Sequence, residues 1–152
     1  MRIVSVSEDK KIEKRIAVTP GVVKKYLNLG FEIFLPENYG THLGITDNEF
    51  KDVGASILKN EKELINNSDL IIQLGLLPED KLSLLKEGQS IVGILDPYKN
   101  KEKIESLAKK NINLFSLELL PRITRAQSMD ILSSQANLAG YKAVIESFAN
   151  FE

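Results

Sequence analysis

The sequence contains no cysteine and only one histidine, His42, among its 152 residues. Without cysteine the chain forms neither a disulfide nor a thiolate metal site, and a reducing compartment suits it. One histidine is too few for the histidine-rich ligand sets of most zinc sites. We therefore expect no bound metal.

Long apolar stretches are also missing, and charge of neither sign dominates. No apolar run approaches the roughly 18 residues that a membrane-spanning helix needs, and the N-terminus lacks a basic region followed by an apolar stretch. The net charge is −1, with lysine and glutamate mixed along the chain, which does not suit a nucleic-acid or anionic-membrane surface. We expect a cytoplasmic globular domain with no direct membrane insertion and no nucleic-acid partner.

Glycine-rich nucleotide motifs are a third absence. None of the nine glycines belongs to a G-x-G-x-x-G sequence or to a P-loop, so no segment is expected to surround a pyrophosphate with backbone amides in the standard way. Ser/His/Asp and paired-carboxylate arrangements are missing too, so no catalytic residue of the acid/base type is expected. Asp96, which precedes Pro97, is expected to form a turn, and His42 to lie in a loop.

What the sequence does contain is a regular alternation of strand-like and helix-like segments. Strands are predicted at Ile3–Val6, Glu32–Leu35, Leu70–Leu74, Ser90–Leu95 and Leu114–Leu117. Helices are predicted to begin at Pro20 and at Asp47, and to cover Glu61–Asn66, Pro78–Lys86 and Lys101–Lys110. The alternation predicts an α/β fold with a mostly parallel sheet, helices on both faces and a flavodoxin-like or Rossmann-like strand order.

A long helix is predicted at the end of the chain, from about Ser128 to Phe148. Ser128 fits the N-cap position, and Asp130 in the first turn suits the positive end of the helix dipole. Residues 1–127 are therefore expected to form the α/β domain and residues 128–152 the long helix. The chain ends without a glycine cap or a proline, which we interpret as a cut rather than a natural end.

Arginine is scarce, with four residues against sixteen lysines. Where lysine is the default cation, an arginine marks a place that uses the rigid fork of the guanidinium. Arg15 lies in the segment 14–20, directly before a predicted helix. Two interpretations remain open at this point: Arg15 binds an anionic substrate, or it pairs with Glu13 or Asp9.

The segment Pro121–Tyr141 follows the fifth predicted strand, at the sheet edge where α/β proteins bind ligands. It concentrates polar side chains of complementary kinds, namely Arg122, Arg125, Gln127, Asp130 and Ser133. Gln127 offers both the donor and the acceptor that a carboxamide ligand needs. The alternative is a helix N-cap with solvated charges and one Arg–Asp pair.

Several segments together resemble the shared N-terminal domain of alanine dehydrogenase and the alpha subunit of proton-translocating NAD(P)+ transhydrogenase. The similar positions are Arg2-Ile3, Arg15 with Val18–Pro20, Leu29–Phe31, Ile45–Asp47, Gly54-Ala55 and Ser68-Asp69. The resemblance covers essentially the whole chain. The segment 122–141 is similar to the transhydrogenase branch specifically.

Two positions depart from alanine dehydrogenase. That enzyme needs a lysine near the end of the third predicted strand and a histidine at the end of the fourth, where this chain has Gly75 and Asp96. Without the lysine the substrate carboxylate loses a partner, and without the histidine no acid/base group is evident. Amino-acid oxidation is therefore not expected.

The resemblance to transhydrogenase implies a piece of an NAD(H)-binding component. Such a component positions the nicotinamide for hydride transfer between NADH and NADP+, coupled to proton translocation, and the protein mainly orients the rings and excludes water. The resemblance implies that Arg122 and Ser133 contact the nicotinamide mononucleotide end of NAD(H). It implies that Gln127 and Asp130 orient the ring and its carboxamide.

The implied partners lie outside these residues. They are a glycine-rich Rossmann domain of the same subunit, absent here, to which the helix at residues 128–152 leads, an NADP(H)-binding component, a membrane component, and a second copy in a homodimer. The assembly is expected on the cytoplasmic side, peripheral to the membrane. This chain alone is expected to bind NAD(H) weakly or not at all and to be inactive.

Two other functions stay open. One is an alanine dehydrogenase-like oxidoreductase. The other is a non-enzymatic binding or dimerisation module, in which the small residues between Ala136 and Ala143 form an interface.

Overall fold

The computed structural model, which describes residues 1–151, contains a six-stranded parallel sheet of order β3-β2-β1-β4-β5-β6. The strands are β1 (Arg2–Val4), β2 (Glu32–Pro36), β3 (Ser56–Leu58), β4 (Leu70–Ile72), β5 (Ser90–Gly93) and β6 (Asn113–Ser116). The expected α/β class and mostly parallel sheet are therefore confirmed. The order is the Rossmann one, in which the chain reverses direction across the sheet between β1 and β4.

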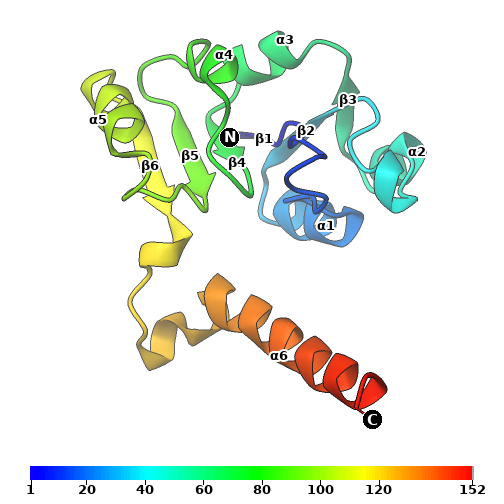
Figure 1. Ribbon diagram of the computed structural model, residues 1–152. Coiled ribbons are helices and arrows are strands. Elements are labelled where there is room, and N and C mark those ends of the chain that lie inside the picture. The colour runs from blue at the N-terminus through cyan, green and yellow to red at the C-terminus, as the bar shows by residue number, and fades with distance from the viewer. Residues whose placement is uncertain (152) are drawn as a thin grey trace. The chain divides into compact units, whose positions relative to one another are not determined.

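Helices cover both faces of this sheet (Figure 1). Those of the first 116 residues are α1 (Pro20–Asn28), α2 (Asp47–Asp52), α3 (Glu61–Asn66), α4 (Glu79–Leu82) and α5 (Lys101–Lys109), with a 3₁₀ helix η1 (Thr41–Leu43). The register explains the two cores: Ile3 pairs with Ile33 on one face, and Val4 with Phe34 on the other. One apolar cluster includes residues of α1 and α2, and the second includes residues of α3, α4 and α5.

Two elements differ from the sequence prediction. Strand β3 was missed because it is a three-residue edge strand that pairs only with β2, too short to show a strand period. Helix α4 ends at Leu82 instead of Lys86. The backbone leaves the helical pattern because the Ser83 hydroxyl donates to the Asp80 carbonyl at 2.6 Å, and the Lys86 N–H donates to the Gln89 side chain at 2.7 Å.

The chain divides into two compact units, and the second begins at Leu117. It contains the 3₁₀ helices η2 (Leu117–Leu119) and η3 (Thr124–Met129) and the long helix α6 (Ile131–Ala149). None of the α6 residues is buried within the described chain. Among the helices of residues 1–151, none combines the length and apolar character that crossing a membrane requires.

The predicted start of the long helix was wrong by three residues. Asp130, not Ser128, is the N-cap of α6, because its side chain accepts the N–H groups of Leu132 and Ser133. Ser128 instead belongs to η3, a segment for which the sequence showed no regular pattern. The final residue of the predicted segment 128–152 lies outside the described residues.

Candidate functional site

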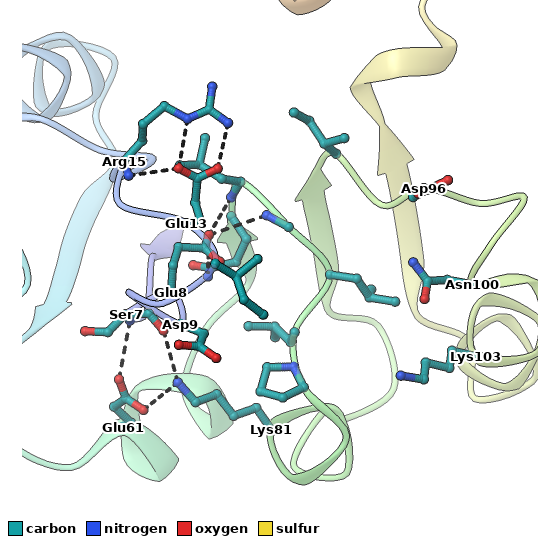
Figure 2. A pocket seen from close by; sticks show the side chains of 18 residues that line it. Ser7, Glu8, Asp9, Glu13, Arg15, Glu61, Lys81, Asp96, Asn100 and Lys103 are labelled. Atoms are coloured by element: carbon teal, nitrogen blue, oxygen red, sulfur yellow. Dashed lines mark hydrogen bonds and ion pairs between the residues drawn. The ribbon is translucent and has the colours of Figure 1, made fainter.

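A cavity of about 830 Å³ opens at the carboxyl edge of the sheet, where β1, β4 and β5 end. This edge, beside the reversal of strand order, is where folds of this topology bind ligands. Five carboxylates and three cations line it: Glu8, Asp9, Glu13, Glu61 and Asp96, with Arg15, Lys81 and Lys103 (Figure 2). We call this cavity the sheet-edge crevice.

The lysines of the crevice are paired with carboxylates of the chain. Lys81 forms an ion pair with Glu61 at 2.8 Å and donates to the Ser7 carbonyl at 3.3 Å. Lys103 lies 3.6 Å from the Glu79 carboxylate. Because these charges are already balanced, the crevice offers little net attraction to an anionic ligand.

Arg15 pairs with Glu13, the second of its two sequence interpretations. Its Nε and Nη2 donate to the two oxygens of Glu13 at 2.9 and 2.6 Å, and its backbone N–H donates to the same carboxylate at 2.9 Å. The fork geometry is the strong form of an arginine–carboxylate contact. Hydrogen bonding from Arg15 is the main reason that the pKa of Glu13 lies below its ordinary value.

Glu8, which sequence reasoning missed, lies at the centre of this crevice. Its Oε1 accepts the Gln73 side-chain amide at 3.1 Å, the Leu74 N–H at 2.7 Å and the Gly75 N–H at 3.4 Å. Burial raises the pKa of Glu8 above its ordinary value, and Glu13 adds to the rise, while the two backbone N–H groups and Lys81 oppose it. Desolvation of the charged form is the larger effect.

A buried chain of hydrogen bonds supports Glu8. The Tyr39 hydroxyl accepts the N–H groups of Ala17 and Val18 at 3.1 and 3.2 Å, so its own proton points to Ser5 Oγ, 2.7 Å away. Ser5 Oγ then donates to Gln73 Oε1 at 3.0 Å. This chain of bonds connects the segment before α1 to the end of β4.

The two positions that depart from alanine dehydrogenase also line the crevice. A Cβ atom at Gly75 would have only the Glu8 carboxylate nearby, 3.9 Å away, so the absent side chain leaves open space. Asp96 forms the expected turn, accepting the N–H groups of Lys99 and Asn100 at its carbonyl, 3.1 and 2.9 Å away. His42 lies in η1, not in an irregular loop, and its Nε2 donates to the Lys14 carbonyl at 2.8 Å.

The second unit contains the four predicted cofactor residues, and two of them bind each other. The Asp130 carboxylate accepts the Leu132 and Ser133 N–H groups, both at 3.0 Å, and the Ser133 hydroxyl at 2.6 Å. These bonds, led by the Ser133 hydroxyl, lower the pKa of Asp130, and the charge of Arg122 adds to the effect. The carboxylate is therefore ionised and oriented at the start of α6.

The other two predicted cofactor residues are exposed. Arg122 and Gln127 both face solvent, as does Arg125. Within residues 1–151 the Gln127 side chain makes no hydrogen bond, so its amide is available to a ligand in both donor and acceptor roles. In the same range, no group of three or more acidic or histidine side chains is arranged to hold a metal ion.

Three residues that organise the crevice were overlooked in the sequence, namely Glu8, Tyr39 and Gln73. The usable signal was Gln73, a polar residue directly after the apolar strand 70–72. Its partner Glu8 is 65 residues away in the sequence, so no local pattern connects them.

Comparison with known proteins places this geometry in a family context. The sequence matches the family described as alanine dehydrogenase/PNT, N-terminal domain, over residues 5–139. It is 42% identical over 151 residues to the first of the parts that make up the NAD(P) transhydrogenase alpha subunit of Rickettsia prowazekii (strain Madrid E), covering 97% of this chain and 39% of that protein. It is 39% identical over 156 residues to the protein of the same name from Rhodospirillum rubrum, covering 99% and 41%.

A solved structure is similar as well. The crystal structure of transhydrogenase from Sinorhizobium meliloti superposes with a TM-score of 0.88 at 37% identity, over 99% of this chain and 45% of that chain. The chain thus spans less than half the length of each of these three relatives.

Proposed function

Because this chain belongs to the alanine dehydrogenase/PNT N-terminal domain family, we propose that it forms a portion of the NAD(H)-binding component of an NAD(P)+ transhydrogenase. The observation that carries the proposal is the start of α6, where an ionised and capped Asp130 follows a Gln127 whose amide is free. The identity to the transhydrogenase relatives supports the same branch.

NAD(H) supplies the hydride chemistry when bound, and the residues of this chain would orient it. Gln127 would donate to and accept from the carboxamide of the nicotinamide, because its amide has both functions free. Asp130 would add a fixed negative charge beside the ring, and Arg122 a mobile positive one. Ser133 would act from the same turn, where its hydroxyl is held by Asp130.

The remaining elements of the proposal concern the complete protein. We propose that α6 leads toward a glycine-rich Rossmann domain that binds the rest of NAD(H), and that NADP(H) is bound by a separate component. A membrane component would couple hydride transfer to proton translocation, and the complete subunit would act as a homodimer at the cytoplasmic face of the membrane.

Alanine dehydrogenase activity is the weaker proposal. The crevice has Gly75 and Asp96 where that enzyme needs lysine and histidine, and Glu13 already binds the guanidinium of Arg15. Such an activity would appear as pyruvate-dependent oxidation of NADH by the full-length protein. A non-enzymatic module would instead show a stable oligomer with no NAD(H) binding even at full length.

The decisive test compares variants in the full-length protein assembled with its NADP-binding partner. Gln127→Asn shortens the side chain by one methylene and should lower the rate of hydride transfer by about tenfold to a hundredfold, the typical effect of a misplaced reactant. Gln135→Asn is the matched control, since Gln135 lies exposed on α6 away from the polar segment. Equal rates for both variants and the unaltered protein would reject the role of Gln127.

A further inference from the structure

The first unit contains a second feature that does not depend on hydride transfer. Three N–H donors converge at the end of β4: the Leu74 and Gly75 backbone groups and the Gln73 side-chain amide. We call these three donors the amide seat. All three reach the same oxygen of Glu8, a residue from the segment after β1.

The amide seat is preorganised as a donor site. Gln73 is 3% exposed, and its Oε1 accepts the Val6 N–H at 2.8 Å and the Ser5 hydroxyl at 3.0 Å. With the oxygen held in this way, the Gln73 nitrogen must face Glu8. The seat therefore presents only donors, which is the arrangement that a carboxylate oxygen needs.

We propose that the amide seat is a binding site for small monocarboxylates, which the chain fills with its own Glu8 so that the segment from Glu8 to Arg15 is anchored at the wall of the sheet-edge crevice. The anchored segment turns back at Asp9, whose carbonyl accepts the N–H groups of Ile12 and Glu13 at 2.9 and 2.8 Å. Its far end carries the Glu13–Arg15 pair. Glu8 is thus a positioning residue for Arg15.

The chemistry of the surroundings defines the ligand class. The seat contacts one oxygen and is close to the charge of Glu13, which opposes a second negative charge. A dianion such as phosphate is therefore disfavoured, whereas formate and acetate carry a single charge. Gly75 contributes no side chain, and the seat lines the cavity of about 830 Å³, so a small carboxylate has room to enter once Glu8 is removed.

Glu8 holds the seat by its tether. An attached group acts at an effective concentration in the millimolar range or above, so dilute carboxylates do not displace it. Removal of the side chain should convert the intramolecular contact into a site for a free ligand. This conversion distinguishes a carboxylate seat from a side chain that merely fills space, because an unrelated cavity has no preference for carboxylates.

The test is chemical rescue of Glu8→Ala in the full chain. We expect a lower melting temperature and faster amide hydrogen exchange at Ile12 and Glu13. Sodium formate or acetate should restore both quantities more than sodium chloride at equal ionic strength. Glu8→Gln is the matched control: its carboxamide fills the seat, so formate should have no more effect than chloride.

Two results would overturn the inference. One is an equal response of Glu8→Ala to formate and chloride. The other comes from the unaltered chain and needs no variant: the amide protons of Leu74 and Gly75 should titrate together with the Glu8 carboxyl carbon in NMR spectra. Independent titration would contradict the seat even if Glu8→Ala does not fold. Neither outcome bears on NAD(H) binding at Gln127, so this inference and the proposed function fail separately.

Discussion

The Ser133 hydroxyl donates to the Asp130 carboxylate at 2.6 Å, while the Ser133 backbone N–H donates to the other oxygen of that carboxylate at 3.0 Å. One carboxylate thus caps α6 and fixes the rotamer of a second polar residue. Asp130 has a structural role in this chain, which must be separated experimentally from the role we propose toward the nicotinamide.

Replacement of Asp130 by asparagine should achieve that separation. Asparagine caps helices about as well as aspartate, so the free energy of unfolding should change by only a few tenths of a kcal/mol, whereas Asp130→Ala should cost about 1 kcal/mol. Hydride transfer by the complete assembly should fall strongly for both variants, because both remove the charge. Urea denaturation combined with rate measurements checks this, and a normal rate for Asp130→Asn would limit Asp130 to capping.

The buried hydroxyl of Tyr39 should contribute measurably to stability. Tyr39→Phe keeps the ring and its edge-to-face contact with Phe50, but leaves the N–H groups of Ala17 and Val18 and the Ser5 hydroxyl without their partner. Unsatisfied buried donors cost about 1–3 kcal/mol. We expect a loss of that size in urea denaturation. Tyr98→Phe, at a largely exposed tyrosine, serves as the control and should be neutral.

Glu13 and Glu8 should influence the pH dependence of stability in opposite directions. The lowered pKa of Glu13 means that folding favours its ionised form, so its contribution is present above the ordinary value of about 4.3 and is lost as the pH falls through the lower folded value. The pKa of Glu8 is raised, so stability from this group declines as the pH rises from about 4.3 to the higher folded value.

Glutamine variants at the two positions test these signs. Relative to the unaltered chain, Glu13→Gln should be most destabilised near neutral pH and should approach it in acid. Glu8→Gln should improve relative to the unaltered chain as the pH rises, because the cost of ionising a buried carboxyl is removed. Denaturation curves from about pH 3 to about pH 7 cover both windows. Parallel pH profiles for the two variants would contradict the assignment.

The sequence predicted the elements better than their connections. Buried residues such as Ile71 and Ile91 identify central parallel strands, because both faces of such a strand are covered. Strand β3 has no such signature at the sheet edge. The polar segment 122–133 was found because its residues are neighbours in sequence. Glu8 was not, since its role depends on Gln73, and only the folded sheet brings them together.

Two glycine-to-alanine changes should have opposite effects on stability. At Gly93 in β5 a Cβ atom would meet the backbone carbonyl oxygen of Gln73 inside contact distance, and a backbone atom in the sheet has little freedom to move. Gly93→Ala should therefore cost about 1–3 kcal/mol, as overpacking does, and should disturb Gln73 and the amide seat beside it. Gly140 lies within α6 with nothing within 4 Å of an added Cβ atom. Gly140→Ala should stabilise the helix by up to about 1 kcal/mol, because alanine loses less backbone entropy. Urea denaturation followed by circular dichroism measures both changes, and a destabilised Gly140→Ala variant would show that another backbone approaches α6 closely at this residue.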